Sequence, residues 1–200
     1  MRPPMRAPMR APMRIVGGSH RGRRLVAPTG EQVRPTSDRA REALFNVLSH
    51  GRFAASGSPF AGEAVLDAFA GTGAFGLEAL SRGAAEAFFI ENDRAALASL
   101  RRNIAALDEA ERAHVLAGDA TRPPRAPRPC AVVFLDPPYR SGLAAPALVA
   151  LAGLGWLTPG GLAIAEVAAK EELSPPAGFT LIDERTYGAA RLVFLQRSLA

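Results

Sequence analysis

Four apolar runs in this 200-residue chain each end at or just before an acidic residue, and this repetition constrains the fold more than any other feature of the sequence. The four acidic residues are Asp67, Glu91, Asp119 and Asp136. Helix-forming segments separate successive runs, so the pattern predicts an α/β fold with a doubly wound, mostly parallel sheet. In such sheets ligands bind beyond the carboxyl ends of the strands, where these acids are expected to lie.

The chain accommodates a seven-stranded sheet. We expect strands near residues 64–67, 87–91, 114–117, 132–135, 162–167, 179–186 and 191–196, with helices at 77–82 and 94–107. The last two strands are joined through Tyr187 and Gly188, which predicts a closing antiparallel hairpin. Residues 141–165 are uncharged and long enough to span a bilayer, but prolines and glycines interrupt them. A helix, a turn and a buried strand explain this segment better.

Composition argues against several classes of protein. The single cysteine, Cys130, excludes an internal disulfide framework and fits a reducing compartment. His20, His50 and His114 are scattered and do not have the spacing of a zinc site, so no metal is expected. The amino terminus lacks the apolar segment of a signal peptide. We therefore expect a soluble, cytoplasmic protein that does not enter a membrane.

Positive charge is concentrated at the amino end. Residues 1–60 carry 11 arginines against 3 acidic residues, a charge of +8, whereas the remainder of the chain carries −3. A basic arm ahead of a near-neutral domain is typical of proteins that bind a polyanion, with RNA or DNA as the favoured partner.

Three segments divide the chain. Residues 1–12 form a low-complexity Met-Arg-Ala-Pro repeat that is expected to be disordered. Residues 13–62 form a basic extension with a β-hairpin, a helix and a flexible linker at 51–62. Residues 63–200 form the main domain.

The extension carries the arginines that are expected to grip phosphates. Short strands at residues 14–16 and 23–26 flank a basic, glycine-rich turn. Thr36 or Ser37 can cap the following helix, and Arg41 is expected to lie away from its apolar face. That face comprises Ala40, Ala43, Leu44, Val47 and Leu48. The candidate RNA-binding residues are Arg14, His20, Arg21, Arg23, Arg24 and Arg39.

A glycine-rich turn follows the first strand of the main domain. Residues 71–76 match the pattern G-x-G-x-x-G, in which glycines let a nucleotide approach the backbone closely. Glu91 lies 20 residues after Gly71, the separation typical of an acid that binds ribose hydroxyls. By itself this pattern also fits a nicotinamide-dependent dehydrogenase.

A second motif ends the fourth strand, where Asp136 is followed by Pro137, Pro138 and Tyr139. Two prolines make this corner stiff. The Asp136 carboxylate and the Pro137 carbonyl can accept hydrogen bonds from an exocyclic amine, and the Tyr139 ring can stack on a planar base. The corner therefore favours modification of a nucleobase amine.

These motifs together resemble a known family. Asp67-x-Phe69-x-Gly71-x-Gly73 resembles motif I of the class I S-adenosylmethionine-dependent methyltransferases, which have a Rossmann-like fold. The corner at residues 136–139 resembles motif IV of their amino-methylating branch. The resemblance implies catalytic roles for Asp136, Pro137 and Tyr139. It implies cofactor contacts from Asp67, Phe69, Gly71, Thr72, Gly73, Glu91 and Asp119.

Within that branch the resemblance is narrower. Residues 13–25 and 34–46 are similar to the amino-terminal signature of the bacterial RsmD-type rRNA guanine-N2 methyltransferases. This implies methyl transfer from S-adenosylmethionine to N2 of a guanine in 16S rRNA, within an assembled or partly assembled small ribosomal subunit. We expect a monomer.

Three other functions stay open at this point. DNA adenine-N6 methyltransferases share the corner but need a sequence-reading module, for which the chain has no long insertion. A nicotinamide-dependent oxidoreductase would share the glycine turn and leave the corner unexplained. The third alternative is a non-catalytic RNA-binding assembly factor.

Overall fold

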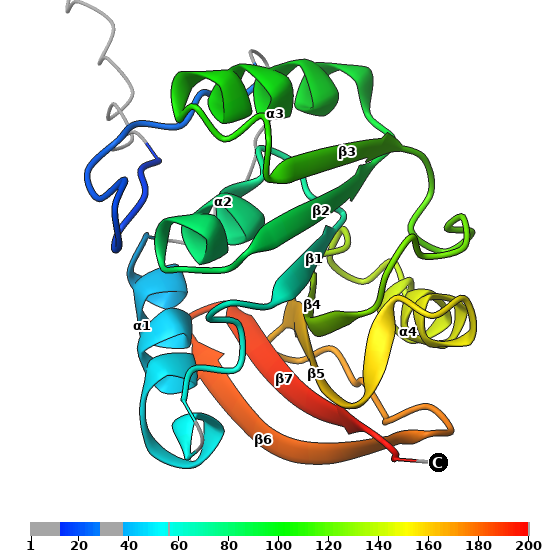
Figure 1. Ribbon diagram of the computed structural model, residues 1–200. Helices are drawn as coiled ribbons and strands as arrows, with labels where there is room; N and C mark the ends of the chain where they lie inside the picture. Colours follow the sequence, from blue (N-terminus) through cyan, green and yellow to red (C-terminus); the bar gives the residue numbers. More distant parts are fainter. Residues whose placement is uncertain (1–12, 29–37, 56, 200) are drawn as a thin grey trace, which may run out of the picture.

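A single seven-stranded sheet forms the centre of the molecule (Figure 1). The computed structural model describes residues 13–28, 38–55 and 57–199. The strands are β1 (Ala64–Ala68), β2 (Glu86–Glu91), β3 (Ala113–Ala117), β4 (Cys130–Leu135), β5 (Leu157–Ala168), β6 (Phe179–Tyr187) and β7 (Ala190–Arg197). Their order in the sheet is β3-β2-β1-β4-β5-β7-β6.

The pairing confirms the predicted topology. Strands β1 to β5 pair in parallel with their neighbours, and β7 pairs antiparallel with both β5 and β6. The strand order reverses between β1 and β4, which creates the crevice where such sheets bind ligands. The fold is thus a Rossmann-like, mostly parallel sheet with a closing antiparallel hairpin.

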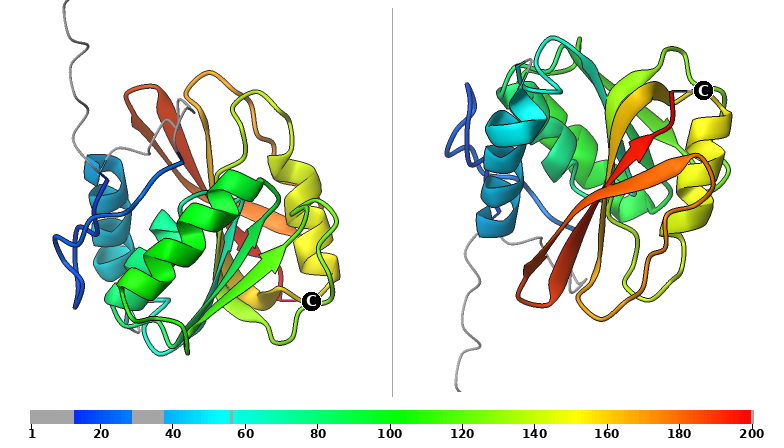
Figure 2. Two further views of the ribbon diagram at one scale, coloured as in Figure 1. Left: turned by 90° about the horizontal axis from the view of Figure 1, so that it is seen from above. Right: turned by 90° about the horizontal axis from the view of Figure 1, so that it is seen from below.

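Helices cover both faces of the sheet (Figure 2). They are α1 (Asp38–Ser49), α2 (Ala74–Ser81), α3 (Arg94–Ala106) and α4 (Ala144–Gly153), with a 3₁₀ helix η1 (Gly51–Ala54). Apolar residues of α1, α2 and α3 share one core cluster with strand residues such as Phe134, whereas α4 packs in a second cluster with Leu135. Each central strand is therefore buried on both sides, which explains its unbroken apolar run.

Two elements extend further than the sequence predicts. Helix α2 begins at Ala74 rather than at residue 77. Strand β5 begins at Leu157 rather than at 162, because an irregularity between Cys130 and Val132 lets its first residues pair with β4 beyond the Pro159-Gly160 interruption.

The predicted hairpin in the extension is wrong as a pair of regular strands. Its pairing is an isolated antiparallel bridge between Arg14 and Arg24. The Leu25 amide also donates to the Met13 carbonyl at 2.8 Å. The Ile15 amide donates to the Arg23 carbonyl at 2.9 Å, and Ile15 and Leu25 are buried in the first core cluster. Backbone hydrogen bonds and packing against the domain therefore both hold this short, glycine-rich segment.

Arg41 lies inside the protein, contrary to the expectation that it points away from the apolar face of α1. Its side chain is fully buried, pairs with Asp38 at 3.0 Å and donates to the Arg14 carbonyl. The fully buried Glu78 of α2 lies 3.7 Å away. A buried cation requires such a countercharge, and that carboxylate comes from a helix distant in sequence.

The segment expected to be a flexible linker contributes to the core. Phe53 stacks on Phe194 of β7 with ring centroids 5.1 Å apart. Phe60 is 1% exposed and meets Phe45 of α1 edge to face at 5.4 Å. The extension and the domain therefore share one hydrophobic core.

Several expectations fall on residues outside the described part of the chain. These are the disordered tail at 1–12 and the helix caps Thr36 and Ser37. Among the described residues, no helix is long and apolar enough to cross a membrane. No group of three or more histidine, cysteine or acidic side chains in those same residues could hold a metal ion.

Candidate active site

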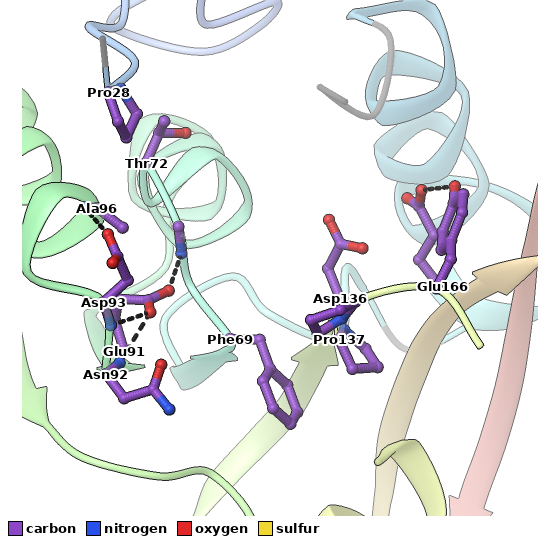
Figure 3. Close-up of a pocket in the computed structure, with 13 residues that line it drawn as sticks. Pro28, Phe69, Thr72, Glu91, Asn92, Asp93, Ala96, Asp136, Pro137 and Glu166 are labelled. Carbon is purple, nitrogen blue, oxygen red and sulfur yellow. Dashed lines mark hydrogen bonds between the residues drawn. The ribbon is translucent and has the colours of Figure 1, made fainter. Parts of the chain in front are cut away.

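A cavity of about 540 Å³ opens at the carboxyl ends of β1, β2, β4 and β5 (Figure 3). Its walls combine residues from both motifs and from the extension. They are Pro28, Phe69, Gly71, Thr72, Glu91, Asn92, Asp93, Ala96, Asp136, Pro137, Pro138, Tyr139 and Glu166. The fold thus brings the glycine turn and the Asp136 corner, 65 residues apart in sequence, to one site.

The glycine turn connects β1 to α2 in a conformation that few other residues adopt. Gly71 and Gly73 have φ values of 55° and 79°. A side chain on Gly73 would also collide with Leu100 of α3, so the turn packs closely against that helix. Phe69 lines the cavity with φ of 62°, an uncommon value for a bulky residue that is typical of strained functional sites.

Asp67 supports this turn from below. Its side chain is 1% exposed, accepts a hydrogen bond from the Gly76 amide at 2.9 Å and is not among the residues that line the cavity. The pKa of Asp67 is raised to about 7. Burial is the main cause, the Gly76 hydrogen bond opposes it, and the negative charge of Glu91 adds to it. The structure therefore places Asp67 as a residue that holds the turn, behind the cavity wall.

Glu91 lies in the cavity wall and is held by backbone amides (Figure 3). One carboxylate oxygen accepts from Gly71 at 2.7 Å, and the other accepts from Asn92 and Asp93 at 2.8 Å each. Three amide hydrogen bonds fix the carboxylate and link the end of β2 to the glycine turn. Each oxygen has two lone-pair directions, and the three amides use three of the four, so one direction remains for a ligand hydroxyl.

The start of α3 completes this half of the cavity and was not expected from the sequence. Asp93 caps the helix by accepting from the Ala96 amide at 2.7 Å. Asn92, Asp93 and Ala96 all line the cavity. An Asp directly before a helix is a recognisable cap, but its presence at a ligand site depends on where the helix begins.

Asp119 lies apart from these residues. It follows β3, is exposed and is not among the residues that line the cavity. The backbone amide and hydroxyl of Thr121 both donate to it at 2.8 Å and lower the pKa of Asp119.

The Asp136 corner forms the opposite half of the cavity. The Asp136 amide donates to the Ala68 carbonyl at 3.4 Å, so the corner still follows β1 beyond the end of β4. Pro137, Pro138 and Tyr139 continue the wall. The Arg140 amide donates to Glu171 at 2.8 Å and fixes the residue after the corner to the loop that follows β5.

Glu166 was missed by reasoning from the sequence. It is 4% exposed, lines the cavity, and accepts a hydrogen bond from the Tyr139 hydroxyl at 2.8 Å (Figure 3). A carboxylate within the apolar strand β5 was the signal that could have revealed it, because a buried charge needs partners.

The candidate RNA-binding residues lie outside the cavity wall, and three of them contact the protein itself. His20 pairs with Glu109 at 2.6 Å, Arg14 pairs with Asp38 at 3.4 Å, and Arg23 donates to the Ala106 carbonyl. The other three, Arg21, Arg24 and Arg39, are exposed.

Known proteins resemble this chain over nearly its whole length. The model of the family described as Conserved hypothetical protein 95 matches residues 13–196. Ribosomal RNA small subunit methyltransferase D of Escherichia coli K12 is 39% identical over 92% of this chain and 89% of its own length. The protein of the same name from Haemophilus influenzae is 36% identical over 88% of this chain and 89% of its own length.

Solved structures agree with these relatives. A structure from Escherichia coli superposes with a TM-score of 0.80 at 38% identity and covers 95% of this chain and 100% of that one. An RNA methyltransferase from Salinibacter ruber, 13% identical, superposes with a TM-score of 0.62 over 82% of this chain and 94% of that one, and so shares the fold. The chain is a methyltransferase and belongs to the Conserved hypothetical protein 95 family, that of the bacterial RsmD-type enzymes.

Proposed function

We propose that the protein transfers a methyl group from S-adenosylmethionine to the exocyclic N2 amine of a guanine in 16S rRNA. The observation that carries this proposal is the shared cavity of about 540 Å³, whose walls include both Glu91 and the Asp136 corner. A volume in this range holds a small-molecule cofactor. A nicotinamide-dependent dehydrogenase would have no use for the rigid Asp-Pro-Pro-Tyr corner.

The residues at the ends of β1 and β2 fit S-adenosylmethionine. Glu91 supplies an acceptor for a ribose hydroxyl, and Gly71 brings the backbone close to the cavity. Asp93 and Ala96 offer the start of a helix beside the same wall. The bound cofactor supplies an electrophilic methyl group, so the protein has to align the amine rather than provide a nucleophile. In the Salinibacter ruber methyltransferase, S-adenosyl-L-homocysteine is the ligand of the same fold.

The corner at the end of β4 fits the amine. The Asp136 carboxylate and the Pro137 carbonyl accept hydrogen bonds from the two amine protons, which directs the nitrogen lone pair towards the methyl group. The same bonds stabilise the positive charge that develops on nitrogen during transfer. The Tyr139 ring stacks on the base, a contact worth about 1 to 3 kcal/mol in other base stacks.

The extension supplies the RNA contacts. Arg21, Arg24 and Arg39 are exposed, and the relatives are named for ribosomal RNA of the small subunit. Residues 13–62 therefore act as an RNA-binding extension on the catalytic domain at 63–200. The substrate is 16S rRNA within an assembled or partly assembled small subunit, and the enzyme acts as a monomer.

Mass mapping of 16S rRNA from cells with and without the gene tests this function directly. We expect one guanine to lose its N2-methyl group in the deletion strain and to regain it when purified protein and S-adenosylmethionine are added to isolated subunits. Loss of an N6-methyladenine from DNA would instead support the adenine-methylating alternative. Unchanged rRNA and DNA methylation would leave a non-catalytic assembly factor.

A further inference from the structure

Glu166 is a buried acid that the proposed reaction does not yet use. It interrupts an apolar stretch of β5 between Ala165 and Val167, which are 0% and 1% exposed. Burial of a carboxylate costs several kcal/mol unless hydrogen bonds compensate for lost water. The Tyr139 hydroxyl donates one such bond at 2.8 Å. A carboxylate accepts about four hydrogen bonds, so the bond from Tyr139 does not by itself saturate Glu166.

The last register pair of β4 and β5 directly precedes both acids. Leu135 of β4 pairs with Ala165 of β5 in parallel, and the two acids are the next residues along each chain. Neighbouring strands are about 4.8 Å apart, and paired positions project to the same face. Both acids line the cavity, and Figure 3 shows Glu166 and Asp136 on neighbouring parts of its wall.

Two adjacent carboxylates match one nucleobase edge. Guanine presents the N1–H donor next to its N2 amine, whereas adenine presents an N1 acceptor next to N6 and cytosine an N3 acceptor next to N4. An acid beside the group that holds the amine therefore attracts guanine and repels the lone pair of the other two bases. We infer that Glu166 accepts a hydrogen bond from guanine N1–H and makes the site selective for guanine, an inference that rests on the proposed binding of the amine by Asp136.

2-Aminopurine provides the probe, because it keeps the 2-amine and has an acceptor at N1. Small subunits would be reconstituted with ligated 16S rRNA that carries guanine or 2-aminopurine at the nucleotide found by mass mapping. For the unmodified enzyme we expect kcat/KM to be about 10- to 150-fold lower with 2-aminopurine, the range for a hydrogen bond to a charged group. Equal rates on the two bases would overturn the inference.

Glu166→Gln tests the residue itself. The amide keeps the size of the side chain, accepts N1–H weakly and can donate to an N1 acceptor, so the guanine to 2-aminopurine ratio should fall towards 1. Tyr139→Phe is the matched control, because it removes the hydroxyl beside Glu166 and keeps both the ring and the carboxylate. That variant should retain most of the ratio.

Folding of the variants is followed by thermal melting and by calorimetric titration with S-adenosylhomocysteine. A Glu166→Gln protein that binds this ligand normally and keeps the full ratio would show that Glu166 only orients Tyr139. Equal rates of the unmodified enzyme on the two bases would overturn the inference even if the variant does not fold. Because 2-aminopurine also lacks O6, a lower rate is assigned to Glu166 only when the Glu166→Gln protein reduces the ratio. Mass mapping distinguishes a failure of the proposed function from a failure of the Glu166 inference. Absence of N2-methylguanine refutes the proposed function before 2-aminopurine is used.

Discussion

The two halves of the cavity are built in different ways. At the ends of β1 and β2, Glu91 is held by three backbone amides, two of which belong to the next two residues. At the ends of β4 and β5, Tyr139 and Glu166 hold each other through their side chains, 27 residues apart. The half proposed to bind the cofactor therefore depends on local backbone geometry, and the half proposed to bind the base depends on contacts between two strands. They are called the cofactor half and the base half below. Substitutions in each half should accordingly affect different measurements.

The largest effect is expected in the base half, at Asp136. Asp136→Ala removes an acceptor that strengthens as charge develops on the amine, and comparable losses in other enzymes lower kcat about 10²- to 10³-fold. Affinity for S-adenosylhomocysteine and the melting temperature should stay near the original values, since the residue lies across the cavity from Glu91. Methyl incorporation into subunits is the measurement. Glu111→Ala, at an exposed acid beside the amino end of β3, serves as the control.

Glu91→Ala should lower cofactor affinity, the measurement that Asp136→Ala leaves unchanged. We expect S-adenosylhomocysteine to bind about 1.5 to 3 kcal/mol more weakly in calorimetry, the range for hydrogen bonds to a charged group. The melting temperature should also fall, because three amides lose their acceptor. Glu86→Ala, at the opposite end of the same strand, is the control and should keep full affinity. Normal cofactor affinity in Glu91→Ala would place the ribose elsewhere and contradict the assignment of the cofactor to this half.

Asp67 should make the stability of the protein depend on pH. Burial raises the pKa of Asp67 to about 7 from an ordinary value of 3.8, so the folded protein binds a proton that the unfolded chain has released between these pH values. Stability should therefore fall as pH rises through this window, by about 1.4 kcal/mol per unit at most. Asp67→Asn keeps an acceptor for Gly76 and removes the titration. Urea unfolding at pH 5, 6 and 7 should show the variant gaining stability relative to the original protein, and a constant difference would contradict the shifted pKa.

The smallest effect is expected outside both halves, on the extension. Arg21→Gln with Arg24→Gln removes two exposed charges. Each phosphate contact changes the slope of log K against log salt by about 0.7 to 0.9. The slope for RNA binding should therefore become shallower by about 1.4 to 1.8. Cofactor affinity should be unaffected. Arg125→Gln with Arg128→Gln, in the loop before β4, is the charge-matched control, and an equal loss there would show that the arginines act only through net charge.

The fold and the cofactor half were largely predictable from the sequence. Apolar runs of four to six residues between helix-forming segments identify strands because a strand buried on both faces cannot carry polar alternation. The glycine turn, Glu91 and the corner are visible for a related reason. Residues that need unusual backbone angles, stiff turns or positions at strand ends leave local signatures within a few residues of each other.

Other features were decided by contacts between distant segments. Arg41 was expected on the surface and is buried because Glu78, 37 residues later, faces it from α2. His20 was considered only as a contact to RNA, and the structure shows that it pairs with Glu109. A helical pattern shows which residues share a face, but not which charges the neighbouring element presents to them.

The sequence by itself determined the order of strands and helices, the glycine turn and the Asp136 corner, because each depends on short-range backbone preferences and on burial. The tertiary structure alone decided that Pro28 lines the cavity and that Asp67 is buried beneath the glycine turn. It also decided that Glu166 and Asp136 line the same cavity, each directly after the register pair of Leu135 with Ala165. Register is set by the packing of the whole sheet, and a shift of one residue would turn Glu166 to the opposite face.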